Sequence, residues 1–592
     1  MVRTFNTHNI RKQQELTGKY WDFSPCVGKY AGEHFKVATP CCWESHPKFA
    51  GYRGEGEYTT TFKTGGNIRL EFKGISHTAE VWLDGRKIAK HYNAYTIFDA
   101  VCTNLSYGEH TLTVRADNRF SEKSALHIPN DYMSYGGVSR PVVLEQISDV
   151  YIRNVHVTPY KADGKWKAKI EIYLENTKGN KYGDKDCFKI NETENISENN
   201  RCVSDGENDI KKSENRSVDV LVKVAGGKYN CEKLNCFWKN IDVEKNNIVK
   251  AEMEFDNINE WTPETSELYY IEVKLLRNEK AFDDLIDRFG FREIKVSGKE
   301  ILLNGEKIRI KGVCRHEDHP QFGCALPFAA IAADIELVKD MGANSIRTSH
   351  YPNDEIFLDI CDEQGILVWE ENHARGLSEE NMRNPNFEPQ AEKVIEEMIP
   401  AHYNHPSIYI WGILNECASD TEYGKECYKK QFDIIRKLDT SRPCSFASCK
   451  FKTDICFELP DVVSYNIYPL WYHDAEPDEF LDDLYKWVQN ETKGVGKPFM
   501  ITEIGAGGLY GYRNNYDSKW TEEYQAEALR KQLTAVLGYK DCIGVYIWQF
   551  CDIRISDEWF GTRPRTMNNK GIVDEFRRKK LAYNVVKEIF GK

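Results

Sequence analysis

The 592-residue sequence has no long apolar run: nowhere do about 18 apolar residues follow one another, the length that a helix needs to cross a bilayer. Its first residues also lack the apolar segment of a secretory signal peptide. The 18 cysteines are scattered over a large chain, a pattern that favours free thiols in a reducing compartment over a disulfide framework. We therefore expect no membrane partner and a cytoplasmic location.

Positive charge is also scarce, because 92 acidic residues outnumber 79 basic ones and leave a formal net charge of −13. Proteins that bind nucleic acids carry basic patches that displace the counterions of the phosphates. We therefore expect no nucleic-acid partner. An anionic ligand would need a local cation in its binding site.

The sequence does contain two series of short segments in which apolar and polar residues alternate. The first series, up to about residue 150, includes EYTTTFKT and HTAEVWLDG, and the second, from about 151 to 292, includes KAKIEIYLEN and VDVLVKVAG. Alternation with a period of two indicates strands with one buried face, so each series predicts a β-sandwich. The polar, Asn- and Lys-rich segment 178–217 interrupts the second series, and we interpret it as an inserted surface loop.

After about residue 293 the pattern changes to apolar, strand-like runs that alternate with amphipathic helical segments. Such alternation is typical of βα units that build a parallel sheet. We count eight strand candidates, which is the number of strands in a (β/α)8 barrel. They are the segments 308–313, 344–350, 366–371, 408–416, 445–449, 462–468, 498–505 and 545–550.

Two of these apolar strands end in a glutamate. Glu416 closes the fourth strand, directly after Asn415, and Glu503 lies near the end of the seventh. The active site of such a barrel forms at the carboxyl ends of its strands, and strands four and seven lie across its mouth from each other. One such glutamate could equally form an ion pair at the rim, but two facing carboxylates are what acid-assisted cleavage of a glycosidic bond requires.

The segments IWGILNE and MITEIG resemble the acid and nucleophile strands of glycoside hydrolase family 2. DYMSYGGVSRPV, GVCRHEDHP, GANSIRTSHYP and IWQF are similar to that family at corresponding places, and the resemblance spans the chain apart from 178–217. It implies a jelly-roll β-sandwich over 1–150, an immunoglobulin-like β-sandwich over 151–292 and a catalytic (β/α)8 TIM barrel over 293–592. It also implies a homo-oligomer, either a dimer or a tetramer.

By this resemblance Glu416 is the general acid/base and Glu503 the nucleophile of a retaining glycosidase, whose carboxyl groups lie about 5–5.5 Å apart. Asn415 would bind the sugar 2-hydroxyl, and Tyr468 would orient the nucleophile. Further residues that are similar to the family's sugar contacts are Asp131, His316, Asn466, Tyr472 and Trp548.

No cofactor is expected for this chemistry. His316, Glu317, Asp318 and His319 are potential metal ligands by residue type. Because consecutive residues cannot readily converge on one ion, we expect no metal site there.

The segment after the eighth strand bears on the class of sugar. Asn568, Asn569 and Lys570 reproduce the Asn-x-Lys motif that separates the β-glucuronidases of the family from its galactosidases and mannosidases. An ammonium group and an amide donor would pair with the carboxylate at C6 of a uronic acid, although Asn-Asn-Lys-Gly is also good turn chemistry. The family's glucuronidases also use a nearby arginine, for which Arg563 and Arg565 are both candidates.

We therefore predict an exo-acting β-glucuronidase whose substrate is a small-molecule glucuronide or a uronide-terminated saccharide. The alternative is a β-galacturonidase or a dual hexuronidase, because Asn568 and Lys570 would read C6 and not the configuration at C4. A plain β-galactosidase agrees less well with this motif. A carbohydrate-binding protein without turnover agrees less well with the paired glutamates Glu416 and Glu503.

Overall fold

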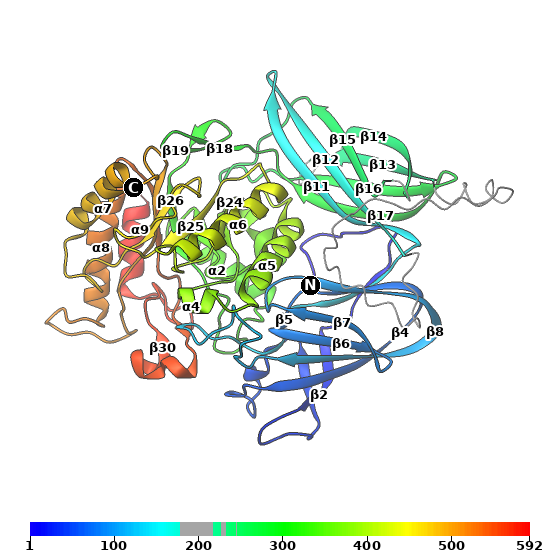
Figure 1. Cartoon of the computed structure of the whole chain (residues 1–592), viewed down its shortest axis with the longest axis horizontal. Helices are drawn as coiled ribbons and strands as arrows, with labels where there is room; N and C mark the ends of the chain where they lie inside the picture. The colour runs from blue at the N-terminus through cyan, green and yellow to red at the C-terminus, as the bar shows by residue number, and fades with distance from the viewer. Residues whose placement is uncertain (178–216, 227–232, 244–245, 592) are drawn as a thin grey trace.

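The structure, a computed structural model, describes residues 1–177, 217–226, 233–243 and 246–591. The surface insertion was predicted over 178–217, of which residues 178–216 lie outside the described residues. In Figure 1 two β-rich regions lie one above the other beside a region of mixed helices and strands. Among the described residues, no helix combines the length and the apolar character that a bilayer span requires.

The first β-rich region is an antiparallel sheet of eight strands. They are β1 (Gln13–Glu15), β2 (Lys19–Pro25), β3 (Phe35–Thr39), β4 (Glu55–Phe72), β6 (Thr78–Leu83), β7 (Arg86–Tyr92), β8 (Phe98–Asp117) and β10 (Val142–Gln146). Burial alternates along β6, where Ala79, Val81 and Leu83 are fully buried. This alternation confirms the predicted half-buried strands. The short elements η1 (Trp43–Ser45), β5 (Ile75–Ser76) and β9 (Gly137–Val138) complete this region.

The second β-rich region consists of two sheets that share one core. One sheet has the order β11-β12-β15 and the other the order β14-β13-β16-β17. The strands are β11 (Val150–Ala162), β12 (Lys165–Asn176), β13 (Ser217–Ala225), β14 (Lys233–Asp242), β15 (Ile248–Phe255), β16 (Tyr269–Arg277) and β17 (Lys280–Phe289). Val155 and Ile170 of one sheet belong to the same hydrophobic cluster as Val222 and Ile271 of the other. The second series of alternating segments is therefore a β-sandwich, as predicted.

The rest of the chain contains a closed barrel of eight parallel strands, in which the first strand pairs with the last. They are β21 (Ile310–Cys314), β22 (Ser345–Arg347), β23 (Leu367–Glu371), β24 (Ile408–Ile413), β25 (Cys444–Ser448), β26 (Val463–Asn466), β27 (Phe499–Ile504) and β28 (Cys542–Ile547). Each overlaps one of the eight predicted strands, so the predicted fold class is confirmed. Every residue of β24, β27 and β28 is buried, because side chains fill the barrel and helices cover it.

The helices of this region are α2 (Phe328–Asp340), α3 (Glu355–Gln364), α4 (Glu379–Met382), α5 (Phe387–His402), α6 (Glu422–Leu438), α7 (Pro477–Glu491), α8 (Glu522–Gly538) and α9 (Leu581–Phe590). Its short elements are β18 (Ile294–Ser297), β19 (Glu300–Leu303), β20 (Glu306–Lys307), β29 (Ile553–Arg554), η2 (Asp557–Thr562), η3 (Pro564–Thr566) and β30 (Met567–Asn568). The predicted limits of the three domains, 1–150, 151–292 and 293–592, stay a prediction.

The segment between β8 and β10 leaves the first sheet and lies against the barrel. The Ser556 backbone N–H donates to the Asn130 carbonyl at 3.2 Å, and the Ser556 hydroxyl donates to the Tyr132 carbonyl at 3.0 Å. Arg140, in the same segment, donates to the Glu317 carboxylate at 2.8 Å. These contacts hold Asp131 of the first region at the mouth of the barrel.

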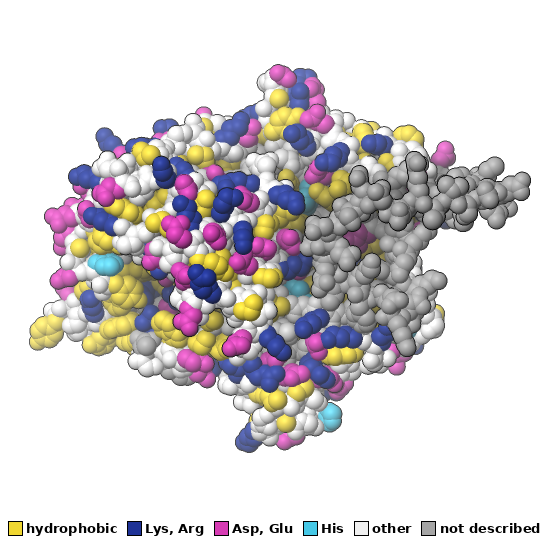
Figure 2. All heavy atoms as spheres, in the orientation of Figure 1, with side chains coloured by type: hydrophobic (Ala, Val, Ile, Leu, Met, Phe, Trp, Pro, Cys, Tyr) yellow, Lys and Arg dark blue, Asp and Glu magenta, His cyan; other side chains and the backbone are white. Residues whose placement is uncertain are grey.

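On the face of the molecule that Figure 2 shows, basic and acidic side chains are interspersed over the barrel region. Among the described residues that are coloured on that face, no extended basic patch of the kind that would neutralise a phosphate backbone is seen.

Candidate active site

The two glutamates singled out in the sequence lie at the carboxyl ends of β24 and β27 and are joined by a network of hydrogen bonds. Arg347, the last residue of β22, donates to Glu503 Oε1 at 3.0 Å and to Asn415 Oδ1 at 2.7 Å. Asn466 Nδ2 donates to Asn415 Oδ1 and to Glu416 Oε1, each at 3.0 Å. The structure therefore brings both glutamates and both asparagines together at one barrel mouth.

The backbone leaves the barrel ladder just before the first of these glutamates. The predicted fourth strand continues to residue 416, but β24 ends at Ile413, and φ is 45° at Leu414 and 55° at Glu416. Residues other than glycine rarely adopt this left-handed backbone conformation, and those that do concentrate at functional sites. The Glu416 side chain is 18% exposed, whereas that of Glu503 is 5% exposed. Glu416 can therefore meet a leaving group and water, while Glu503 is fixed within the site.

Glu503 is held by donors on both of its carboxylate oxygens. Arg347 donates to Oε1, and the Tyr468 hydroxyl makes a short hydrogen bond to Oε2. Burial, and next the charge of Glu416, raise the pKa of Glu503 to about 7, although Arg347 and the Tyr468 hydroxyl oppose this rise. The two donors thus fix the orientation of a carboxylate whose charge is easily lost.

The Asn415 side chain, which belongs to the same network, has one amide atom without a hydrogen-bond partner among the described residues. Its Oδ1 atom accepts from Arg347 and Asn466, but in the described part of the chain its buried Nδ2 atom has no hydrogen-bond partner. A buried amide donor without a partner is costly unless a ligand supplies an acceptor. This arrangement agrees with the predicted contact between Asn415 and a sugar hydroxyl.

Lys570 lies in a buried, aromatic environment. Its Nζ atom donates to the Tyr472 hydroxyl at 2.9 Å and lies 5.1–5.9 Å from the ring centroids of Tyr468, Trp471 and Tyr472. Aromatic faces stabilise an ammonium group but do not neutralise it. Within the described ranges no carboxylate lies within 4.0 Å of this Nζ atom, although Lys570 is only 3% exposed. The site therefore contains a buried lysine that has no carboxylate partner among the described residues.

Asp131 joins the lysine side of the site to the glutamate side. Its Oδ2 atom accepts from Asn568 at 3.2 Å and pairs with Arg563 at 3.4 Å, while Arg375 lies 3.4 Å from Oδ1. Although burial raises the pKa of Asp131, Arg375, Lys570 and Arg563 lower it to about 2. Asp131 is therefore an anion that pairs with two arginines, Arg375 and Arg563, at the barrel mouth.

His316 and Trp548 form part of the wall near Asp131. The His316 ring lies 5.4 Å from the Trp548 ring, and His350 stacks on Trp548 at 5.1 Å. Glu317 pairs with Arg140 at 2.8 Å, and Asp318 accepts from the Tyr135 hydroxyl at 2.7 Å. Two of the four consecutive potential metal ligands are thus engaged by separate protein partners.

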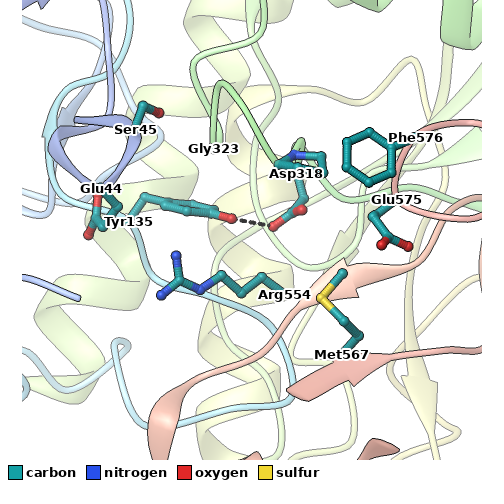
Figure 3. A pocket seen from close by; sticks show the side chains of 10 residues that line it. Glu44, Ser45, Tyr135, Asp318, Gly323, Arg554, Met567, Glu575 and Phe576 are labelled. Carbon is teal, nitrogen blue, oxygen red and sulfur yellow. Dashed lines mark hydrogen bonds between the residues drawn. The ribbon is translucent and has the colours of Figure 1, made fainter. Parts of the chain in front are cut away.

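Of the two candidate arginines, only Arg563 reaches the group around Asp131. Arg563 also lies 3.5 Å from the Tyr472 hydroxyl, whereas Arg565 forms an ion pair with Glu575. The backbone turns at Arg565, where φ is 58°, and this turn directs its side chain elsewhere. Glu575 lines a separate pocket of about 210 Å³ (Figure 3), together with residues that include Glu44, Tyr135, Asp318, Arg554 and Met567. The structure does not bring Arg565 to the group around Asp131, and its role as a sugar contact stays a prediction.

Two arginines of the site were not among the residues predicted from the sequence. Arg347 ends β22, and Arg375 follows β23 and lies 3.5 Å from Glu416 Oε2. The rule that identified the glutamates, a polar residue at the end of a buried strand, would also have identified Arg347. Arg375 lies in a loop after its strand, where the sequence carries no comparable signal.

Comparisons with known proteins agree with this geometry. Three models of glycosyl hydrolase family 2 match the chain: the galactose-binding domain-like model over residues 45–160, the general family model over 188–292 and the TIM barrel domain model over 294–592. A curated β-glucuronidase of Paenibacillus borealis is 25% identical over 89% of this chain and 85% of its own length. A β-galactosidase of Thermoanaerobacterium thermosulfurigenes is 29% identical over 88% of this chain and 66% of its own length.

Among solved structures, the family 2 β-galacturonidase of Eisenbergiella tayi bound to galacturonate is 53% identical, with a TM-score of 0.88. The match covers 100% of this chain and 99% of that chain. This chain belongs to glycosyl hydrolase family 2 and is a glycosidase of the type that includes the β-glucuronidases and the β-galacturonidase.

Proposed function

We propose that this enzyme is a retaining exo-β-D-galacturonidase that releases galacturonate from the non-reducing end of β-galacturonides. The observation that supports a uronide as the substrate is the buried Lys570 ammonium beside Glu416 and Glu503. No carboxylate of the described residues lies within 4.0 Å of its Nζ atom. A C6 carboxylate would accept charge-assisted hydrogen bonds from Lys570 and from Arg563. The galacturonide is favoured over other uronides because the 53% identical relative is a β-galacturonidase.

In the proposed mechanism the Glu503 carboxylate attacks the anomeric carbon while Glu416 protonates the glycosidic oxygen, and the aglycone leaves as an alcohol. The product of this step is a glycosyl ester of Glu503. Glu416, now a carboxylate, removes a proton from water, which attacks the anomeric carbon and releases Glu503. The Asn415 amide would donate to the sugar 2-hydroxyl, and Tyr468 and Arg347 would orient the nucleophile.

A β-glucuronidase is the second candidate, because the curated relative from Paenibacillus borealis has that activity and is 25% identical. Galacturonides and glucuronides differ only in the configuration at C4. We expect kcat/KM for p-nitrophenyl β-D-galacturonide to exceed that for p-nitrophenyl β-D-glucuronide, and both to exceed that for the neutral β-D-galactoside. A larger kcat/KM for the glucuronide would establish the second candidate. A larger value for the galactoside would contradict a uronide substrate.

The pKa of Glu503 predicts the acidic limb of the pH profile. A nucleophilic carboxylate must be ionised, so kcat/KM should be high above pH 7 and fall about tenfold per pH unit below it. Because the charge of Glu416 contributes to the rise in this pKa, Glu416→Gln should move the limb to lower pH. The measurement requires a 2,4-dinitrophenyl galacturonide, whose leaving group departs without a proton. An unmoved limb in Glu416→Gln would show that another group controls it.

We also propose a cytoplasmic location, which is supported by the free thiol state of every cysteine in the described ranges. The homo-oligomeric state expected from the family resemblance stays a prediction.

A further inference from the structure

A buried lysine that precedes the last helix contacts the segment that carries Lys570. The Lys580 Nζ atom donates to the carbonyls of Gly508 and Asn569, at 2.6 and 3.3 Å, and to Asp552 Oδ1 at 2.7 Å. An ammonium group has three N–H donors, so each one has a protein acceptor. Lys580 is therefore not available to a ligand, and its contacts serve the protein.

The three acceptors of Lys580 come from three segments around the site. Gly508 follows the strand of Glu503, Asp552 follows β28, and Asn569 immediately precedes Lys570. A direct backbone hydrogen bond of 2.9 Å, from Gly508 N–H to the Asn569 carbonyl, joins two of these segments. Lys580 is thus the common point at which the lysine side of the site is tied to the nucleophile side.

The ion pair of Lys580 and Asp552 holds the peptide groups on both sides of Lys570. Lys580 binds the Asn569 carbonyl on the N-terminal side, and Asp552 Oδ1 accepts from the Gly571 N–H at 2.9 Å on the C-terminal side. A Cβ atom at residue 571 would lie 2.2 Å from the Asp552 backbone nitrogen, so only glycine permits this close approach. The backbone of Lys570 is therefore fixed from both ends.

Both members of this pair have fully buried side chains, with 0% exposure each. Burying two charges is costly, and a buried ion pair often contributes little net stability. Such a pair is better explained by the positions that it imposes on its neighbours than by the stability that it adds. Here the neighbours are the two peptide groups that flank the proposed uronate-binding lysine.

We propose that Lys580 and Asp552 are positioning residues for substrate selection: their buried ion pair aims the Lys570 ammonium at the C6 carboxylate of the sugar. This inference rests on the proposed function, because it assigns to Lys570 the recognition of a uronate. The pair touches neither Glu416 nor Glu503 among the described contacts. Its loss should therefore affect the binding of a charged sugar more than the chemical step.

The test compares kcat/KM for p-nitrophenyl β-D-galacturonide with that for the neutral β-D-galactoside in Lys580→Met. We expect the ratio to fall about 10- to 100-fold, mainly through a higher KM for the galacturonide, since displacing a binding group by about 1 Å costs up to about 100-fold. Burial raises the pKa of Asp552 to about 7 although Lys580 lowers it, so Asp552 can become a neutral acid in this variant. Asp552→Asn/Lys580→Met, which removes both charges, should show the same fall in the ratio.

Lys73→Met is the matched control for the loss of a buried lysine. Lys73 pairs with Glu71 and Glu355, each at 2.7 Å, and neither of these ion pairs includes Lys570 or its neighbours in the sequence. This control should lower the melting temperature and leave the ratio within about twofold of that of the wild type. A ratio that falls equally in Lys73→Met would mean that the change reports only a weakened fold and would overturn the inference.

A double-mutant cycle separates this inference from the proposed function. If Lys580 acts through Lys570, Lys580→Met should not change the ratio further in a Lys570→Ala background. A further fall in that background, or a wild-type ratio in Lys580→Met, would overturn the positioning role while leaving the uronate site intact. An unchanged ratio in Lys570→Ala alone would overturn the uronate site, and the positioning role with it.

Discussion

Glu503→Ala should lower kcat by about 10⁴-fold or more, because the loss of a covalent nucleophile in other hydrolases has effects of this size or larger. Without this carboxylate no glycosyl ester can form, and water has no activated carbon to attack. The methyl group of alanine leaves a space at the anomeric position, so azide should restore part of the turnover and give an α-glycosyl azide. The measurement is the steady-state rate with and without azide, with the product identified by NMR.

Glu370→Ala is a suitable control for this variant. Glu370 is a fully buried glutamate of β23, a barrel strand that pairs with β22 and β24, and it accepts a hydrogen bond from His402 at 2.8 Å. Its removal should lower the stability but leave kcat within a few-fold of the wild-type value. Turnover of Glu503→Ala at a tenth of the wild-type rate or above would show that another residue is the nucleophile.

Lys570→Ala should lower kcat/KM for the galacturonide by about 10²- to 10³-fold, the usual effect of removing one partner of a buried, hydrogen-bonded charge pair. The same variant should change kcat/KM for the neutral galactoside by less than about tenfold, because that sugar has no carboxylate for Lys570 to bind. The two substrates are compared at one pH above 7, where Glu503 is ionised.

Lys519→Ala provides the matched control for the lysine. The Lys519 ammonium lies 5.5 Å from the ring of Trp471, the same ring that Lys570 faces at 5.8 Å, and it donates to the Trp471 carbonyl. Lys519 is exposed, and we expect its removal to leave the preference for the uronide unchanged. Equal losses on both substrates in Lys570→Ala would mean that this lysine supports the fold and not the recognition of a carboxylate.

The sequence predicted the barrel well because its strands are buried on both faces and therefore read as continuous apolar runs. The same burial made Glu416 and Glu503 conspicuous, since a carboxylate at the end of such a run needs a function or a partner. The fourth strand ends three residues earlier than predicted because the backbone turns at Leu414. This turn depends on local conformation, which the apolar pattern does not encode.

The parts of the site that could not be derived from local patterns depend on contacts between distant segments. Asp131 meets Asn568 across more than four hundred residues of sequence, and only the family resemblance pointed to it. Arg563 and Arg565 have different partners, Asp131 and Glu575, and the backbone between them includes a residue with a φ of 58° that the sequence pattern does not reveal. The Asn-x-Lys motif does not depend on the configuration at C4 of the sugar. A galacturonide is favoured over a glucuronide only because the 53% identical relative is a β-galacturonidase.

A 2-deoxy-2-fluoro-β-D-galacturonosyl fluoride tests in one measurement whether this enzyme is a uronide hydrolase with Glu503 as its nucleophile. The fluorine at C2 slows the second step, so the glycosyl ester should accumulate and inactivate the enzyme. Peptide mass spectrometry of the inactivated protein should find one 2-deoxy-2-fluorogalacturonosyl group, attached to Glu503. A label on Glu416 or on any other residue, or continued turnover of the fluoride without a labelled peptide, would contradict the account.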